Sequence, residues 1–409
     1  MYLEIQKCRI SGSSNLIPVI SLGEQYLTGV FPKSPSETIT KGPIDLVWCP
    51  DSGLLQMKQS YNLEEMYGDN YGYRSGLNAS MVNHLHQKAR VLGKAADLRP
   101  GDTVLDIGSN DATLLNAFPD FVHKIGVDPT GNKFREFYGP EIALIPDFFS
   151  AEVYRRQFES QKPKLITSIA MFYDLENPAN FVKDIHTLLA PDGLWHFEQS
   201  YMPSMLRTNS YDTICHEHIE FYSFEVVKTL LEAHDLKIID VQMNSINGGS
   251  FAVTAAKKQA DYLPNHAVIN WLLHQEESLG LDTPKPFREF EERVYKHRKA
   301  LLELIEKIVD SGKTVFGYGA STKGNVLLQF CGITNRLLPF IAEVNPNKYG
   351  CYTPGTHIPI ISDKEAIAMK PDYFLVLPWH FKHGILEKEK EFIRNGGKFI
   401  FPLPEIEII

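Results

Sequence analysis

The chain has 409 residues, of which 43% are hydrophobic and 22% charged, and a formal net charge of −9; these values suit a globular protein of two to three domains. The acidic balance argues against a nucleic-acid partner, and no apolar run approaches the roughly 20 residues needed to cross a bilayer. Five scattered cysteines argue against a disulfide framework, so we expect a reduced, cytoplasmic protein, and the sequence carries no signal for an oligomeric state.

The predicted elements divide the chain into four segments. Residues 1–75 form a small, turn-rich lobe, and residues 76–260 alternate strands and helices in the pattern of a doubly wound α/β sheet. Residues 261–310 are helical and rich in charge, and residues 311–409 form a second α/β domain. Strands are expected at residues 17–22 and 44–48 in the lobe, and at 103–107, 124–127, 165–169 and 194–198 in the first sheet.

A glycine-bearing loop follows the first strand of that sheet, with Asp106, Gly108, Asn110 and Asp111 in close succession. Glycine permits the sharp turn from strand to helix, and the helix N-terminus then offers free N–H groups to a ligand. Asp128 ends the next strand, where a carboxylate can accept hydrogen bonds from ribose hydroxyls. Because Asn110 stands where a dinucleotide loop would have glycine, we favour the phosphate-free cofactor S-adenosylmethionine (SAM) over a dinucleotide.

Two further cofactor contacts are expected after the next strand-like segment. Asp147 could bind the adenine amino group, and the ring of Phe148 could stack on the base. The alternative interpretation of the whole loop region is an ordinary tight turn without a ligand.

Proton-transfer side chains are concentrated at His216, Glu217 and His218. Histidine titrates near neutrality and suits the role of a general base, and an adjacent carboxylate can orient the ring. A metal site built on the two histidines is an alternative, but no HExxH pattern is present, because position 220 is Glu220. The other alternative is a pair of ordinary loop histidines. We favour the catalytic interpretation and expect no metal.

A second glycine cluster opens the C-terminal α/β domain. Gly319, Ser321 and Lys323 follow a short apolar strand, and a lysine at the start of a helix could contact a diphosphate. Glu343 ends the next strand, where a ribose partner could lie. The spacing is longer than the dinucleotide fingerprint, so a purely structural βα domain is the alternative. Later loops add Tyr352, His357, Trp379 and His380 at the same edge.

The N-terminal lobe contains two incomplete zinc-binding motifs. Cys8 and Cys49 are each followed three positions later by serine, Ser11 and Ser52. Two complete C-x-x-C pairs would be a strong zinc signal, but a serine hydroxyl is a poor zinc ligand. Zinc is therefore doubtful, and we expect the lobe to be held together by its own core.

The combined pattern resembles the three-domain, SAM-dependent sugar C-methyltransferases of unusual deoxysugar biosynthesis, over essentially the whole chain. The resemblance implies a class I methyltransferase Rossmann-like domain, preceded by a lobe of degenerate zinc-binding type and followed by a second Rossmann-like α/β domain. The segments that carry it are the cysteine half-sites, YGYRS (71–75), DIGSNDATLL (106–115), YDTICHEHIEFYS (211–223), NGGS (247–250), GYGASTKGN (317–325), YTPGTHIPI (352–360) and LPWHF (377–381).

The resemblance also implies a reaction. Such enzymes methylate a carbon, often C3, of a nucleotide-linked 4-keto-6-deoxy sugar: a base removes the proton beside the ketone, and the enolate attacks the sulfonium methyl. By position, His218 is the base, Glu217 its carboxylate partner, and Tyr71 or Tyr73 lies near the ketone oxygen or the methyl. The predicted substrate contacts are Tyr222, Asn247, Gly319, Ser321, Lys323, Glu343, Tyr352, His357, Trp379 and His380.

Three departures from the family pattern concern the details of substrate and metal contact. Cys215 stands where many members have tyrosine, Met171 to Asp174 replace an Ala-His pair, and two of the four zinc cysteines are serines. The alternatives to C-methylation are oxygen methylation by the same base, a nicotinamide-dependent sugar ketoreductase that uses the C-terminal glycine loop, and a non-catalytic binding protein.

Overall fold

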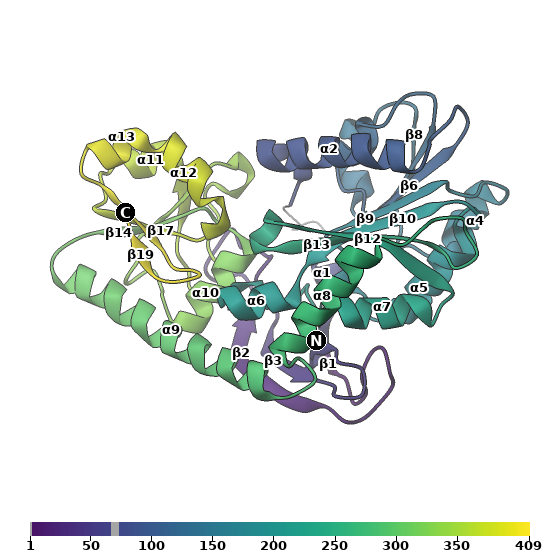
Figure 1. Ribbon diagram of the computed structural model, residues 1–409. Coiled ribbons are helices and arrows are strands. Elements are labelled where there is room, and N and C mark those ends of the chain that lie inside the picture. The colour runs from purple at the N-terminus through teal and green to yellow at the C-terminus, as the bar shows by residue number, and fades with distance from the viewer. Residues whose placement is uncertain (1, 67–72) are drawn as a thin grey trace.

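The computed structural model describes residues 2–66 and 73–409. These residues form an N-terminal lobe, a middle α/β domain and a C-terminal α/β domain, with the lobe lying below the other two in the view of Figure 1. No helix in these two ranges is long and apolar enough to span a membrane.

Two small antiparallel sheets make up the N-terminal lobe, one pairing β1 with β5 and one with the order β11-β4-β3-β2. Its elements are β1 (Tyr2–Glu4), β2 (Ile17–Tyr26), β3 (Lys41–Trp48), β4 (Leu55–Met57), β5 (Gln59–Tyr61), α1 (Leu63–Met66) and β11 (Glu220–Phe221). The edge strand β11 comes from the middle of the chain, directly after His218. The lobe and the middle domain therefore share one sheet.

The middle domain is built on a seven-stranded sheet with the order β12-β13-β10-β9-β6-β7-β8. All neighbours from β10 to β8 are parallel, and β13 is antiparallel to both β10 and β12. This order is that of the class I methyltransferase fold, as expected from the sequence. The strands are β6 (Thr103–Ile107), β7 (His123–Val127), β8 (Ile142–Ile145), β9 (Leu165–Ile169), β10 (Leu194–Ser200), β12 (Leu236–Asn244) and β13 (Ser250–Lys257).

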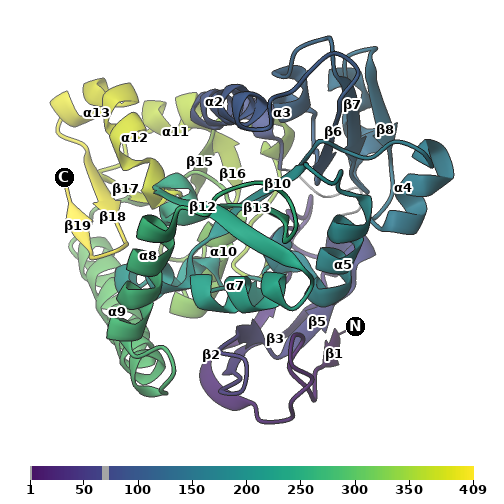
Figure 2. The ribbon, with the colours of Figure 1, turned by 45° about the vertical axis from the view of Figure 1, so that its right-hand side comes forward.

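Helices cover both faces of this sheet (Figure 2). Helix α2 (Ala79–Ala95) begins at Asn78, whose side chain accepts hydrogen bonds from two backbone N–H groups, and packs Met81 and Leu85 on one face. Helices α5 (Pro178–Leu188) and α7 (Phe224–Glu232) cover the other face. The remaining helices of the domain, where η denotes a short 3-10 helix, are η1 (Ser75–Leu77), α3 (Thr113–Asn116), η2 (Gly131–Phe137), α4 (Ala151–Phe158), η3 (Phe172–Asp174), α6 (Met202–Thr208), η4 (Tyr211–Thr213) and η5 (Ile246–Gly248).

The C-terminal domain has a six-stranded sheet with the order β16-β15-β14-β17-β18-β19, parallel except for the pair β18–β19. Its strands are β14 (Val315–Tyr318), β15 (Ile341–Glu343), β16 (Ile360–Ser362), β17 (Tyr373–Val376), β18 (Lys398–Phe401) and β19 (Glu407–Ile408). Its helices are α10 (Thr322–Cys331), η6 (Pro346–Lys348), α11 (Asp363–Ala368), η7 (Trp379–Phe381), α12 (Lys382–Lys388) and α13 (Lys390–Arg394).

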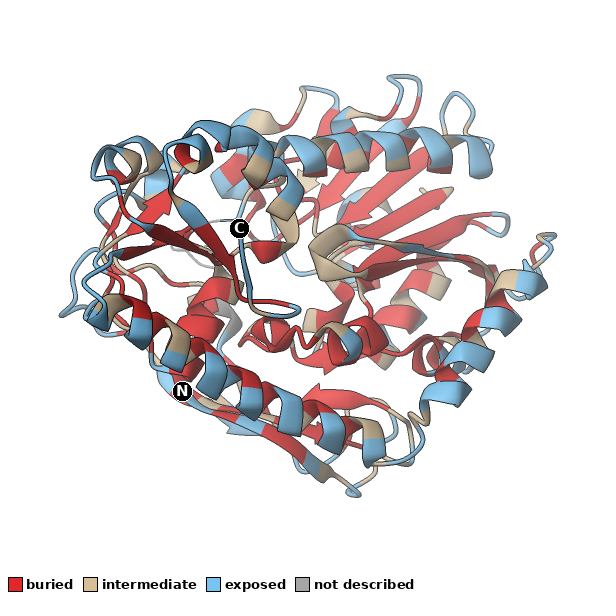
Figure 3. Cartoon of the chain, turned by 60° about the vertical axis from the view of Figure 1, so that its left-hand side comes forward, coloured by how far each residue is buried: buried red, intermediate tan, exposed pale blue. Residues whose placement is uncertain are grey.

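Two helices connect the α/β domains, α8 (His266–Leu279) and the long α9 (Lys285–Asp310). Along α9 the buried residues recur every three or four positions and form one stripe, whereas the outer face is exposed (Figure 3). That stripe joins the lobe to the C-terminal domain in a single core, in which the rings of Trp48 and Phe287 lie 5.2 Å apart.

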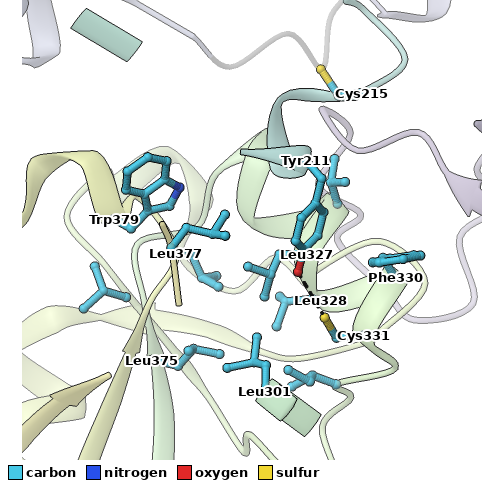
Figure 4. Packing of buried hydrophobic residues seen from close by; sticks show 14 of the residues in the cluster. Tyr211, Cys215, Leu301, Leu327, Leu328, Phe330, Cys331, Leu375, Leu377 and Trp379 are labelled. Carbon is cyan, nitrogen blue, oxygen red and sulfur yellow. Dashed lines mark hydrogen bonds between the residues drawn. The ribbon is translucent and has the colours of Figure 1, made fainter. Parts of the chain in front are cut away.

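The segment before the His216–His218 triplet is anchored in the C-terminal domain (Figure 4). Tyr211 is fully buried there, and its hydroxyl lies 3.0 Å from Nδ1 of His297 and 3.4 Å from Sγ of Cys331. With β11 fixed in the lobe on its other side, the triplet is held between all three domains.

Candidate active site

A cavity of about 500 Å³ opens between the carboxyl ends of β6, β9 and β10 and the N-terminus of α10. Open α/β sheets bind their ligands at this edge. The predicted site residues that line the cavity are Tyr73, Asp106, Gly108, Asn110, Asp128, Phe148, Glu217, His218, Asn247, Ser321, Lys323 and His380. Residues that lie more than 300 positions apart in the sequence thus surround one space.

The glycine loop forms the cofactor end of the cavity. Gly108 has a φ of +75°, a backbone shape that favours glycine, and a β-carbon there would also crowd Cγ of Met171 at 3.1 Å. Asp128 accepts hydrogen bonds from the backbone N–H groups of Asn110 and Thr130, each at 2.7 Å. These bonds fix the carboxylate at the cavity wall, where its remaining lone pairs suit ribose hydroxyls.

Carboxyl groups line this end of the cavity. Burial raises the pKa of Asp106 to about 7, and Asp128 and Glu198 add two further carboxyl groups to the wall. Among the described residues that line the cavity, Lys323 is the only lysine or arginine, and it belongs to the C-terminal domain. SAM combines a nucleoside without phosphates and a positively charged sulfonium, so the donor set at this end fits it.

His218 is a neutral imidazole with one ring nitrogen free. Its Nδ1 lies 2.8 Å from the carbonyl oxygen of Thr213, which can only accept, so Nδ1 carries the proton and Nε2 keeps its lone pair. The ring packs against Tyr173 with centroids 4.4 Å apart. Burial, reinforced by the charge of Lys323, lowers the pKa of His218 to about 3, so the imidazole is neutral at physiological pH.

Glu217 reaches the cavity from a tight turn. Its Oε2 has no hydrogen-bond partner, and burial raises the pKa of its carboxyl group. The backbone of Gly29 in the lobe passes so close that a β-carbon there would overlap Oε1. The N-terminal lobe therefore forms the wall behind this carboxylate, and any larger residue at position 29 would displace it.

The C-terminal domain contributes a positive charge and an imidazole. Lys323, in the first turn of α10, donates to the carbonyl oxygen of Asn247 at 3.0 Å, and burial lowers its pKa. Burial and the charge of Lys323 lower the pKa of His380 to about 3, and its Nδ1 has no partner. This end of the cavity is thus suited to an anionic or hydrogen-bonding group of a substrate.

One predicted catalytic residue, His216, lies away from His218, and a second lies outside the described residues. His216 is fully buried, with Nδ1 3.3 Å from Oγ1 of Thr28 and its ring edge-on to Tyr61. The two histidines would share a face in an extended strand, but the chain turns at His216 and Glu217 and separates them. Tyr71 lies outside the described residues.

Several predicted substrate contacts are engaged within the protein. The Tyr222 hydroxyl donates to Oε2 of Glu220 at 2.5 Å, and the Tyr222 residue is fully buried. Glu343 accepts hydrogen bonds from backbone N–H groups, among them that of Ala320 at 2.7 Å, so it braces the loop after β14. Trp379 donates Nε1–H to Oδ2 of Asp212 at 2.8 Å. The other predicted residues outside the cavity lining are Asp111, Asp147, Gly319, Tyr352 and His357.

Sequence reasoning missed two polar residues at the end of β10. Gln199 is 1% exposed and lines the cavity, yet neither atom of its amide group has a partner. Glu198, also at the wall, lies 2.6 Å from Nε2 of His84 and 2.8 Å from Nζ of Lys88, which fastens α2 to the sheet. The signal was available, since both residues end an apolar strand of a parallel sheet.

The four positions of the zinc motifs converge in the lobe. Sγ of Cys8 lies 3.2 Å from Oγ of Ser52, and Oγ of Ser11 lies 3.6 Å from Sγ of Cys49. Although burial acts to raise it, hydrogen bonds involving Ser11 and Ser52 bring the pKa of Cys8 to about 7. The described residues contain no group of three or more histidine, cysteine or acidic side chains arranged for a metal. Two thiols and two hydroxyls do not fit tetrahedral zinc.

Three family models match the chain in order. A zinc binding domain covers residues 8–67, a methyltransferase domain residues 81–241, and a C-methyltransferase C-terminal domain residues 245–404. The succession agrees with the resemblance drawn from the sequence motifs.

The chain is also similar to individual proteins. It is 33% identical to the C-methyltransferase NovU of Streptomyces niveus over 409 residues, which is 99% of this chain and 97% of NovU. Among solved structures, the N-methyltransferase NodS from Bradyrhizobium japonicum matches at 12% identity and a TM-score of 0.33, over 44% of this chain and 99% of NodS. The plantazolicin methyltransferase BpumL matches at 11% identity and a TM-score of 0.36, over 45% of this chain and 88% of BpumL. At these TM-scores the alignments add nothing to the strand order described above.

The full-length match to NovU and the three successive domains identify the chain as a member of the C-methyltransferase family, an enzyme that transfers the methyl group of SAM to carbon.

Proposed function

We propose that the enzyme methylates a carbon, C3 by expectation, next to the ketone of a nucleotide-linked 4-keto-6-deoxy sugar. The observation that carries the proposal is the state of His218: a neutral imidazole whose Nδ1–H is bound to Thr213, leaving Nε2 as a base in the same cavity as the cofactor loop. A carbon acid needs such a base together with an adjacent carbonyl, because an unactivated sugar C–H does not ionise.

In the proposed reaction, bound SAM supplies an electrophilic methyl group on a sulfonium. Nε2 of His218 takes the proton from the carbon beside the ketone, and the electron pair of that C–H bond delocalises into the carbonyl as an enolate. That carbon would then be the nucleophile for the methyl group that bound SAM would supply, with S-adenosylhomocysteine as the leaving group. Lys323 supports this step, because its positive charge favours negative charge near His218.

Other residues of the cavity, together with Lys323, support an anionic, nucleotide-linked substrate. Ser321 and Lys323 lie at the N-terminus of α10, where free N–H groups and a cation suit phosphate oxygens. Glu217, His380, Gln199 and Asn247 line the same space and offer hydrogen-bonding atoms for sugar hydroxyls.

The test is a panel of nucleotide-linked 4-keto-6-deoxy sugars that differ in nucleotide and configuration. Each is incubated with SAM and the enzyme, and the sugar is analysed by mass spectrometry and NMR. We expect one added methyl group on carbon for at least one member. A methyl group on oxygen, or no product from any member although S-adenosylhomocysteine binds, would contradict the proposal.

A further inference from the structure

The loop after β6 carries two polar side chains that turn toward the segment Tyr73–Gly76, which leads into α2. Tyr73 and Ser75 of this segment line the cavity, on the wall that the glycine loop also lines. We propose that Asn110 and Asp111 are positioning residues that hold the segment Tyr73–Gly76 over the cavity, rather than contacts to the cofactor.

Asn110 contacts the backbone of the segment with both atoms of its amide group. Its Oδ1 accepts a hydrogen bond from the N–H of Ser75 at 2.9 Å, and its Nδ2 donates to the carbonyl oxygen of Tyr73 at 3.2 Å. These two bonds engage one acceptor and one donor of the backbone, two residues apart. They fix the position of the Tyr73 backbone relative to the glycine loop.

Asp111 holds the end of the segment. Its Oδ2 accepts from the N–H of Gly76 at 2.8 Å, and Nε of Arg74 lies 3.7 Å from the same oxygen. The approach is so close that a β-carbon at Gly76 would lie 2.6 Å from Oδ2, so this contact requires glycine at position 76. Asp111 itself is 3% exposed, which makes these contacts largely shielded from water.

The holding residues are themselves rigid. Asn110 has a φ of +48°, a conformation that asparagine tolerates better than most residues, and its backbone N–H donates to Oδ2 of Asp128 at 2.7 Å. Its carbonyl oxygen accepts from the hydroxyl of Tyr138 at 2.8 Å. A continuous set of hydrogen bonds thus runs from Asp128, through Asn110, to the backbone of Tyr73. The glycine loop and the segment Tyr73–Gly76 therefore form one unit.

The positioning is tested by trypsin cleavage after Arg74, which lies inside the held segment. Cleavage requires the segment to open locally, so its rate reports the opening equilibrium. Asn110→Gly keeps the left-handed backbone and removes both amide bonds, and Asp111→Ala removes the carboxylate that accepts from Gly76. We expect cleavage about tenfold or more faster in both, the effect of losing hydrogen bonds that hold a segment closed.

The matched control is the variant Asp97→Gly. Asp97 is also a polar residue with a positive φ, but it lies at the far end of α2, and its side chain contacts only Arg99, at the surface. Its cleavage rate should equal that of the wild type. Asn110→Asp keeps an acceptor for Ser75 but not the donor to Tyr73, so it should give an intermediate rate. Unchanged cleavage in Asn110→Gly and Asp111→Ala would overturn the proposal.

Binding of S-adenosylhomocysteine, measured by calorimetry, separates positioning from cofactor contact. We expect both variants to keep an affinity close to that of the wild type; a loss as large as the gain in cleavage would make these residues cofactor ligands. Turnover should fall, and only this arm rests on the proposed function. If the wild type methylates no sugar, the proposed function fails, whereas the cleavage rates still decide the positioning.

Discussion

At the scale of single residues, the proposed chemistry depends on a histidine that burial keeps neutral. The carbonyl of Thr213 fixes the tautomer of His218, and the nearby charge of Lys323 adds to the effect of burial on its pKa. A base of this kind is present in its reactive form throughout the physiological pH range. The surroundings of His218, more than its residue type, suit it to the proposed role of base.

His218→Ala should abolish methyl transfer and leave the affinity for S-adenosylhomocysteine nearly unchanged, because the cofactor loop lies on other elements. Turnover is measured by mass spectrometry and binding by calorimetry. His123→Ala, an exposed histidine at the start of β7, is the control and should keep full activity. Retention of turnover in His218→Ala would remove this residue from the role of base.

Lys323→Met should raise the pKa of His218, because a neighbouring positive charge disfavours the imidazolium. The neutral ring is the active form, so protonation on acidification removes the base, and the acid limb of kcat/KM should move to higher pH. The pKa itself can be followed by NMR of the imidazole Cε1–H signal. Lys33→Met, on the exposed surface, is the control. Identical titration curves would show that Lys323 does not act on His218.

The sequence predicted the positions of those candidate residues that follow from local pattern. Gly108 and Asp128 occupy the loop and strand end expected for a cofactor, and His218 and Lys323 meet in one cavity. Burial of His216 depends on a turn in the triplet and on Thr28 from another domain, which no local pattern reveals. The same holds for the unpartnered amide of Gln199.

At the scale of elements, the strands of both α/β domains were predictable because each is a short apolar run bounded by turns. Strand β6 has the expected bounds, and β10 extends two residues beyond the expected end. Strand β11 was not predicted, because two residues paired with β4 are defined by a non-local contact and carry no periodicity.

The paired turns of the lobe keep the shape of a metal site without its ligands. In each turn a glycine N–H returns to the cysteine carbonyl, Gly12 to Cys8 at 2.9 Å and Gly53 to Cys49 at 2.8 Å. The backbone that would present four thiols is therefore already formed.

The double variant Ser11→Cys/Ser52→Cys should bind about one zinc ion per chain and melt at a higher temperature with zinc than after chelation. Metal content is measured by mass spectrometry of the dialysed protein. Ser34→Cys/Ser36→Cys adds the same number of thiols to an exposed loop of the lobe and should bind none tightly. A double variant without zinc would show that the four positions are not arranged for tetrahedral binding.

At the scale of the whole molecule, the His216–His218 triplet is held on both sides, by Tyr211 in the core of the C-terminal domain and by β11 in the sheet of the lobe. Tyr211→Phe removes the hydroxyl that His297 and Cys331 share. We expect the free energy of unfolding to fall by about 1–3 kcal/mol, which is the cost of leaving buried polar atoms unpaired. Chemical denaturation measures this change. Tyr154→Phe is the matched control, since that tyrosine is equally buried and its hydroxyl has no partner. Equal effects of the two variants would contradict the anchoring role of Tyr211.

The sheet that β11 completes has a consequence for how such enzymes can diversify by recombination. We expect residues 1–66 not to be exchangeable between relatives as an independent module, because one edge of their sheet is encoded some 150 positions later, beside the His216–His218 triplet. A crossover between these two regions would join a lobe to a foreign edge strand and a foreign wall for Glu217. Chimaeras that inherit both regions from one parent should fold, and lineages should carry the two together.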